Sequence, residues 1–159
     1  MGRPSISSRT VATARSQPSR GTAPNQTIQA RVKPLSFNAP DNWVGLAARY
    51  ADFNNHYYIT ARSPSNELHL KKTVGGSFTT LQSVPFTIAT GVWYKLRLEV
   101  LNTPQNTTEL RVYVDNNDGT GWKLMIDYTD NTPLTTGNSF GLRMFGATAE
   151  YDDVVVATP

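Results

Sequence analysis

Apolar and polar residues alternate with a period of two along most of the chain after residue 42. The alternation is clearest in six segments: WVGLAARY (43–50), NHYYITAR (55–62), NELHLKK (66–72), VWYKLRLEV (92–100), TELRVYV (108–114) and SFGLRMF (139–145). Successive side chains of a β-strand point to opposite faces, so this spacing puts one set in a core and the other on an outer sheet face. No window of about eleven or more residues shows the helical period of about 3.6 residues. The chain is therefore predicted to be all-β.

The inward-facing set of this alternation is apolar and large enough for a core. An earlier run, QTIQARVKPLSF (26–37), predicts the first strand, with Ile28, Ala30 and Val32 on one side. A fully buried apolar side chain contributes about 1.5–3 kcal/mol, so a chain of this length needs no disulfide or metal to fold. The later inward positions are Val44, Leu46, Ala48, Tyr50, Tyr57, Ile59, Ala61, Leu68, Leu70, Tyr94, Leu96, Leu98, Val100, Leu110, Val112, Val114, Phe140, Leu142 and Met144.

Turn signals separate these segments and set the domain organisation. Gly75-Gly76, Asn116-Asn-Asp-Gly119 and similar clusters recur between the strands, which predicts one antiparallel β-sandwich over residues 25–159. Residues 1–24 are rich in Ser, Thr, Arg and Pro and lack acidic and aromatic residues, which predicts disorder or weak edge pairing. This segment lacks the apolar stretch of a secretory signal, and no apolar run approaches the roughly 20 residues of a membrane helix.

Charge and cysteine content exclude several function classes. The formal net charge is +3, but residues 1–40 carry six basic residues and no acidic one, and the rest carries nine basic and twelve acidic residues. Nucleic-acid binding would therefore have to rest on the start of the chain, and it is not expected for the sandwich. The absence of cysteine excludes disulfides, thiolate zinc sites and thiol nucleophiles.

The outward-facing set is cationic and contains tyrosines. Sugars are bound by aromatic faces together with planar, multi-donor side chains, and arginine pairs with carboxylates through two hydrogen bonds. The set therefore predicts a binding surface for sugars, especially acidic ones, if its members share one sheet. The competing interpretation is that these side chains serve solubility and strand propensity. The members are Arg49, Tyr58, Arg62, Lys71, Arg111, Tyr113 and Arg143.

The order of the strands resembles a known family. VGLAARYADFNNHYYITAR, a Leu/Lys strand, FTTLQSVPFTIATGVWYKLRLEV, LRVYVD, a Gly-Leu strand and YDDVVV follow one another over residues 26–157. This order resembles concanavalin A-like (laminin-G-like) jelly-roll domains, such as those appended to bacterial pectate lyases and other extracellular polysaccharide-degrading enzymes. The resemblance implies an antiparallel jelly-roll β-sandwich of two curved sheets. It also implies an extracellular, non-catalytic module that binds a polysaccharide or oligosaccharide or acts as an accessory to the catalytic domain of a parent enzyme. No membrane partner is expected, because the chain lacks a long apolar run.

Catalysis is the alternative function for the same fold. Glucanases of the fold use an E-x-D-x-x-E strand, but here Glu150 and Asp152 are followed by Val155 at the position of the final acid. His69, beside Lys71, leaves open a lyase that uses a histidine or tyrosine base and an arginine to neutralise a carboxylate. A polysaccharide lyase or hydrolase and a purely structural module between domains therefore stand as alternatives.

Calcium is the cofactor that the resemblance suggests. Asp152 and Asp153 resemble the acidic pair with which several β-sandwich carbohydrate-binding families hold a structural Ca²⁺. Neighbouring strand residues point to opposite faces, so only one of the two carboxylates could bind the ion directly. The competing interpretation is a pair of exposed carboxylates. Asp115-Asn-Asn-Asp-Gly119 lacks the spacing of a calcium loop and is predicted to be a hairpin turn.

Overall fold

The computed structural model describes residues 5–7, 12–15 and 24–159. Within these residues, twelve strands form two antiparallel six-stranded sheets, and no helix is long and apolar enough to cross a membrane. Sheet A has the order β1 (Ser5–Ser7), β12 (Ala147–Ala157), β3 (Gln26–Phe37), β8 (Tyr94–Asn102), β9 (Thr108–Asp115) and β10 (Lys123–Asp130). Sheet B has the order β2 (Ala12–Arg15), β11 (Ser139–Phe145), β4 (Asn42–Asp52), β5 (Asn55–Ser63), β6 (Glu67–Val74) and β7 (Ser77–Pro85).

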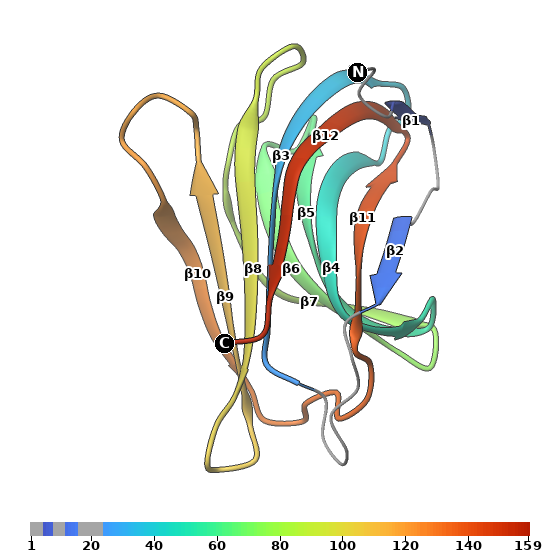
Figure 1. Cartoon of the computed structure of the whole chain (residues 1–159). Helices are drawn as coiled ribbons and strands as arrows, with labels where there is room; N and C mark the ends of the chain where they lie inside the picture. The colour runs from blue at the N-terminus through green and yellow to red at the C-terminus, as the bar shows by residue number, and fades with distance from the viewer. Residues whose placement is uncertain (1–4, 8–11, 16–23) are drawn as a thin grey trace.

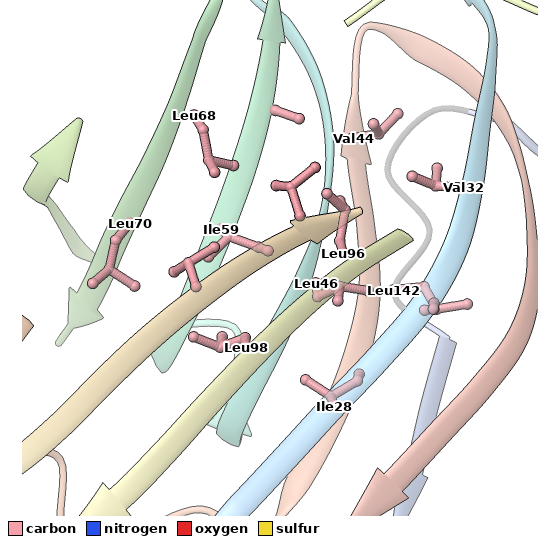
Figure 2. Packing of buried hydrophobic residues seen from close by; sticks show 14 of the residues in the cluster. Ile28, Val32, Val44, Leu46, Ile59, Leu68, Leu70, Leu96, Leu98 and Leu142 are labelled. Carbon is pink, nitrogen blue, oxygen red and sulfur yellow. The ribbon is translucent and has the colours of Figure 1, made fainter. Parts of the chain in front are cut away.

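The two sheets are curved and face each other, with β3, β8 and β12 of sheet A in front of β4, β5 and β6 of sheet B in Figure 1. Their inner faces form one apolar core, to which β3, β4, β5, β6, β8 and β11 contribute the side chains labelled in Figure 2. Leu96 and Leu98 of β8 lie opposite Val114 and Val112 of β9, as the alternation predicts. The predicted antiparallel sandwich of two sheets is therefore confirmed.

Strand pairing joins the beginning and the end of the sequence. β12 pairs with β3, from Ala147 opposite Phe37 to Ala157 opposite Thr27. β1 and β2 extend the two sheets by pairing with β12 and β11. The predicted disorder or weak edge pairing of residues 1–24 otherwise falls on residues that lie outside the described part of the chain.

A β-bulge near the end of β4 reverses two of the predicted side-chain directions. Arg49 has a φ of 45°, and the register with β5 shifts between Ala48 and Asp52. An extra residue in one strand exchanges the inward and outward positions that follow it. Arg49 is consequently 1% exposed and points between the sheets, and Tyr50 lies on the outer face, with its ring 5.0 Å from that of His56. The prediction that Arg49 lies on the outer face and Tyr50 in the core is wrong for this reason.

The buried guanidinium of Arg49 is held by neutral oxygens. Its Nη1 donates to the Thr108 hydroxyl at 2.9 Å and to the Leu134 carbonyl at 3.0 Å, and its Nη2 donates to the Asn102 side-chain oxygen. Burial lowers the pKa of Arg49, although the charge of Asp130 opposes this. Arg49 therefore ties β4 of sheet B to β8 and β9 of sheet A.

Lys72 and Asp130 form a buried ion pair beside Arg49. Lys72 Nζ and the Tyr57 hydroxyl each donate to Asp130 Oδ2 at 2.7 Å, and the Thr132 amide donates to Oδ1 at 3.0 Å. Burial alone would raise the pKa of Asp130, but the hydrogen bonds from Lys72 and Tyr57 outweigh it and hold the pKa below its ordinary value. Arg49, Tyr57, Lys72 and Asp130 are called the interior polar cluster below.

Candidate ligand-binding pocket on sheet B

The register of sheet B brings side chains from four neighbouring strands together on its outer face. Phe145 of β11 lies opposite Trp43 of β4, which in turn lies opposite Arg62 of β5. Tyr58 of β5 lies opposite Lys71 of β6. Directly opposed residues on one face are close enough for their side chains to interact. Strand pairing alone therefore assembles these aromatic and basic groups into one site.

A pocket of about 330 Å³ opens at this place. Its walls combine aromatic rings with three basic side chains and one carboxylate. Pockets that hold small organic ligands have this mixture of an apolar lining and a few polar groups. The lining residues are Asp41, Trp43, Phe53, Tyr58, Arg62, Lys71, Phe78, Arg143, Met144 and Phe145.

Aromatic rings form both the base and the rim of the pocket. Trp43 stacks on Phe145, with 6.4 Å between ring centres and 25° between planes, and its centre lies 5.9 Å from that of Tyr58. Trp43 and Tyr58 are buried, at 7% and 3% exposure, whereas Phe53 and Phe78 are 49% and 52% exposed. The base is thus fixed by packing against the sheet, and the rim offers ring faces to solvent.

Arg143 lies at the centre of these rings. Its guanidinium carbon is 4.6 Å from the ring centre of Tyr58, 5.3 Å from that of Trp43 and 5.6 Å from that of Phe53. The side chain is buried at 7% exposure, and burial lowers its pKa. Nη1 is bonded to His56, whereas within the described residues Nε and Nη2 have no hydrogen-bond partner and are not enclosed by protein. Because Arg143 lines the pocket, these two donors are available to a ligand there.

His56 fixes the orientation of Arg143. Burial first, and then the neighbouring charge of Arg143, lower the pKa of His56 to about 4, so the ring is neutral at pH 7. Its Nδ1 lies 3.1 Å from the Asp52 carbonyl oxygen, which can only accept, so Nδ1 carries the proton. Nε2 therefore accepts from Arg143 Nη1 at 2.5 Å. His56 does not line the pocket, and its role is to position the guanidinium.

The pocket carries more positive than negative charge. Asp41 forms an ion pair with Arg62, which leaves Lys71 and Arg143. Neither has a carboxylate oxygen within 4 Å in the described part of the chain. Burial and the charges of Arg62 and Arg143 lower the pKa of Lys71, and only Asp41 opposes this. The unpaired positive charge suits an anionic group on a ligand.

The predicted outward-facing residues do not all share one face. Tyr58, Arg62, Lys71 and Arg143 meet in the pocket on sheet B. Arg49 is in the interior polar cluster. Arg111 and Tyr113 lie on β9 of sheet A, and they are described separately below.

On sheet A, Arg97 and Arg111 are paired or stacked within the protein. Arg111 donates to Glu109 at 2.8 Å, and the Tyr113 ring lies 5.7 Å from the guanidinium carbon of Arg97. The same guanidinium covers the ring of Trp122 at 4.1 Å. These side chains of sheet A are therefore less available to an anionic ligand than Lys71 and Arg143 of sheet B.

The two predicted metal ligands lie at a second bulge, in β12. Asp153 has a φ of 50°, and its carboxylate lies 3.3 Å from Arg31 Nη1. The Asp153 amide donates to Asp152 Oδ1 at 2.9 Å. Within the described residues, no group of three or more His, Asp or Glu side chains is placed to hold a metal ion.

Several pocket residues were missed by the sequence interpretation. Trp43 and Phe145 precede and follow inward-facing Val44 and Met144, so the period of two does place them outward. Phe53 and Phe78 lie in a turn and in the edge strand β7, where the alternation gives no direction. His56 precedes inward-facing Tyr57, so the period of two places it outward as well, but its role and that of Asp41 depend on contacts between strands.

The fold is decided by likeness to solved structures. The carbohydrate-binding module CBM66 from Bacillus subtilis is similar with a TM-score of 0.67 and 19% identity, over 92% of this chain and 90% of that chain. Sheep galectin-11, in complex with glycerol, is similar with a TM-score of 0.63 and 12% identity, over 96% and 99%. The chain has a concanavalin A-like jelly-roll fold.

Another solved structure shares the fold, and the sequence itself matches no family. The jelly-roll sandwich is also similar to part of a GH43 protein from Bacillus licheniformis, with a TM-score of 0.63 and 14% identity, over 85% of this chain and 28% of that chain. No protein-family model matches the sequence, and no curated protein matches it. At these identities, the likeness establishes the jelly-roll fold alone.

Proposed function

We propose that this chain is a non-catalytic module that binds a polysaccharide or oligosaccharide in the pocket on sheet B. The observation that carries the proposal is the meeting of Trp43, Tyr58 and Phe78 with a guanidinium whose Nε and Nη2 are available to a ligand in the pocket. Aromatic faces stack on sugar rings, and the free donors suit ring substituents. The likeness to a carbohydrate-binding module and to a galectin supports the same function.

The proposal is tested by affinity gel electrophoresis of the whole chain through a panel of neutral and acidic polysaccharides. We expect retardation by at least one polymer and its loss in Phe78→Ala, because Phe78 is 52% exposed at the pocket rim and its removal leaves the core intact. Trp122→Ala on sheet A is the matched control and should migrate like the unmodified chain. Retardation lost only in Trp122→Ala would place the site on sheet A. Equal mobility in every polymer would contradict sugar binding and favour a structural module.

Calcium binding at Asp152 and Asp153 is a separate proposal. Both carboxylates lie near the bulge in β12, where Asp152 Oδ1 accepts from the Asp153 amide and Asp153 pairs with Arg31. A bound calcium ion would raise the melting temperature in millimolar calcium relative to chelator, and Asp152→Asn would abolish the rise. Equal melting temperatures in calcium and chelator would reject the ion.

The setting of the module is also a proposal. The likeness of the jelly-roll sandwich to 28% of a GH43 protein supports a place beside a catalytic domain that acts on extracellular polysaccharide. The expected result is that an antibody against residues 25–159 detects the protein in the culture medium of the source cells. Detection in the cytoplasm alone would reject the extracellular part of the proposal.

A further inference from the structure

Among the described residues, the pocket contains a buried cation that has no carboxylate partner. Arg143 is 7% exposed, and the carboxylate of the pocket, on Asp41, is used by Arg62. Elsewhere in the described chain the buried cation Lys72 has a carboxylate partner, Asp130, at 2.7 Å. A cation taken out of water without a counter-ion is costly to the protein. A ligand that brings an anion into the pocket would remove that cost.

The free edge of Arg143 selects the shape of the anion. Nη1 is held by neutral His56, so within the described residues the edge formed by Nε and Nη2 is the one left for a ligand in the pocket that Arg143 lines. Two parallel N–H donors on one edge match the two oxygens of a planar carboxylate. Lys71, whose pKa is lowered by burial and by its cationic neighbours, adds a second positive charge to the same space. The arrangement therefore favours a carboxylate over a neutral hydroxyl.

The distances from Arg143 to the surrounding rings limit the distance between the carboxylate of a ligand and its sugar ring. The guanidinium carbon is 5.3 Å from the ring centre of Trp43 and 4.6 Å from that of Tyr58. A sugar ring against these aromatics therefore needs an acidic group bonded directly to it, rather than one on a long arm. A hexuronate has this form, since its carboxylate carbon is attached to C5 of the pyranose ring.

We propose that the sheet B pocket binds a hexuronate residue of an acidic polysaccharide, with its carboxylate on the Nε and Nη2 edge of Arg143 and close to Lys71. This inference rests on the proposed sugar-binding function and specifies its ligand class. His56 contributes as a positioning residue, because it accepts from Nη1 and leaves the opposite edge of the guanidinium to the ligand.

The test compares polymers that differ only in their carboxylates. Polygalacturonate, alginate and a glucuronan are offered to the whole chain beside the carboxyl-reduced form of each, and dissociation constants are measured at pH 7 at low and high salt. We expect at least one uronate polymer to bind, and its reduced form to bind about tenfold or more weakly, because the reduced form cannot form the charge-assisted pair. Binding of the uronate should also weaken as salt rises.

Variants locate the effect. Arg143→Met and Lys71→Met should each weaken uronate binding about tenfold or more, and Arg143→Lys should bind more weakly than the unmodified chain because a lysine ammonium lacks the two-donor edge. Arg111→Met, which removes a basic side chain paired with Glu109 on sheet A, is the matched control and should bind normally. Melting curves confirm that each variant is folded.

Each remaining outcome overturns a defined part of the account. Reduced polymers that bind as tightly as the uronates, with binding still lost in Phe78→Ala, would reject the hexuronate and keep the sugar-binding pocket. Binding lost in Arg111→Met but kept in Arg143→Met would move the site to sheet A. An absence of binding to every polymer would reject both proposals.

Discussion

The interior polar cluster and the sheet B pocket both bury positive charge, but the buried cations have protein partners in the cluster and largely lack them in the pocket. In the interior polar cluster, Lys72 is paired with Asp130, and Arg49 donates to three neutral oxygens of the protein. In the pocket, Arg143 is buried to a similar degree, but among the residues that the structure describes it forms a hydrogen bond only with His56. The comparison teaches that burial alone does not mark a functional arginine, whereas buried donors left facing open space do.

The two regions also differ in what they connect. The interior polar cluster joins sheet A to sheet B, because Asp130 lies at the end of β10 and Lys72 on β6. The pocket is formed on one face of sheet B by β4, β5, β6, β7 and β11. Disruption of the interior polar cluster should therefore affect the stability of the whole sandwich, whereas changes in the pocket should affect the ligand.

The largest effect on stability is expected from Asp130→Ala. The change leaves Lys72 buried without a counter-ion and removes the acceptor of Tyr57, so the free energy of unfolding should fall by about 3–5 kcal/mol. Urea denaturation measures it. Asp127→Ala, an exposed carboxylate on the same strand, is the control and should cost less than about 1 kcal/mol. Equal losses in the two variants would show that the ion pair is not a link between the sheets.

The next effect is a pH dependence that comes from His56. Its pKa of about 4 in the folded state lies below the ordinary 6.5, so the unfolded chain binds the proton more readily between these values. Stability should therefore be complete above about pH 6.5 and decrease as the pH falls to about 4, by up to about 3 kcal/mol. The positive charge of Arg143 and the rings of Tyr50, Phe53 and Tyr58 lie around the histidine. The charge of Asp52 opposes the lowering of its pKa but does not outweigh burial and Arg143.

The matched variant for this pH effect is His56→Gln. Glutamine keeps an acceptor for Arg143 but does not titrate, so urea denaturation between pH 7 and pH 4 should show a flatter decline than in the unmodified chain. Parallel declines in the two proteins would contradict the assignment of the effect to His56.

A smaller effect separates the two buried arginines directly. Arg49→Met leaves the oxygens of Thr108, Leu134 and Asn102 without their donor, and it should cost about 2–3 kcal/mol. Arg143→Met leaves His56 Nε2 without its donor but also removes a buried cation that has no carboxylate partner among the described residues, so the two effects oppose each other and stability should change by less than about 1 kcal/mol. Thermal denaturation of both variants measures the difference. A loss from Arg143→Met as large as that from Arg49→Met would mean that Arg143 is a structural residue.

The smallest effect is expected on sheet A. Arg111 is partly exposed and pairs with Glu109 and, at 3.8 Å, with Asp127. Exposed pairs of this kind contribute little, so Arg111→Ala should change stability by less than about 0.5 kcal/mol and leave polysaccharide binding unchanged. A larger change in either measurement would show that the comparison has assigned the functional face to the wrong sheet.

The sequence predicted the fold well because alternation and turn residues are local signals. It predicted the core positions on β5, β6, β8 and β9, such as Ile59, Leu70 and Leu98, which are fully buried. It could not predict the bulge at Arg49, because the left-handed backbone there carries no glycine or other sequence mark. One extra residue was enough to move a predicted ligand contact into the interior.

The candidate site was predicted only in part because it depends on which strands share a sheet. Tyr58, Arg62, Lys71 and Arg143 were found from their phase in the alternation, but the same phase also selected Arg111 and Tyr113 on the other sheet. The pairing of β11 with β4, far apart in the sequence, decides which of them meet. The neutral state of His56 likewise follows from burial and from its contact with Arg143, which no local pattern encodes.

The most direct test of the account follows the three tryptophan indole signals in a nitrogen-labelled sample during titration with a bound oligosaccharide. Trp43 lines the pocket on sheet B, whereas Trp93 and Trp122 lie just before strands of sheet A and contact its arginines Arg31 and Arg97. If the sugar binds in the pocket on sheet B, the Trp43 signal shifts with saturation while those of Trp93 and Trp122 stay in place. Shifts at Trp93 or Trp122 with an unmoved Trp43 would contradict it.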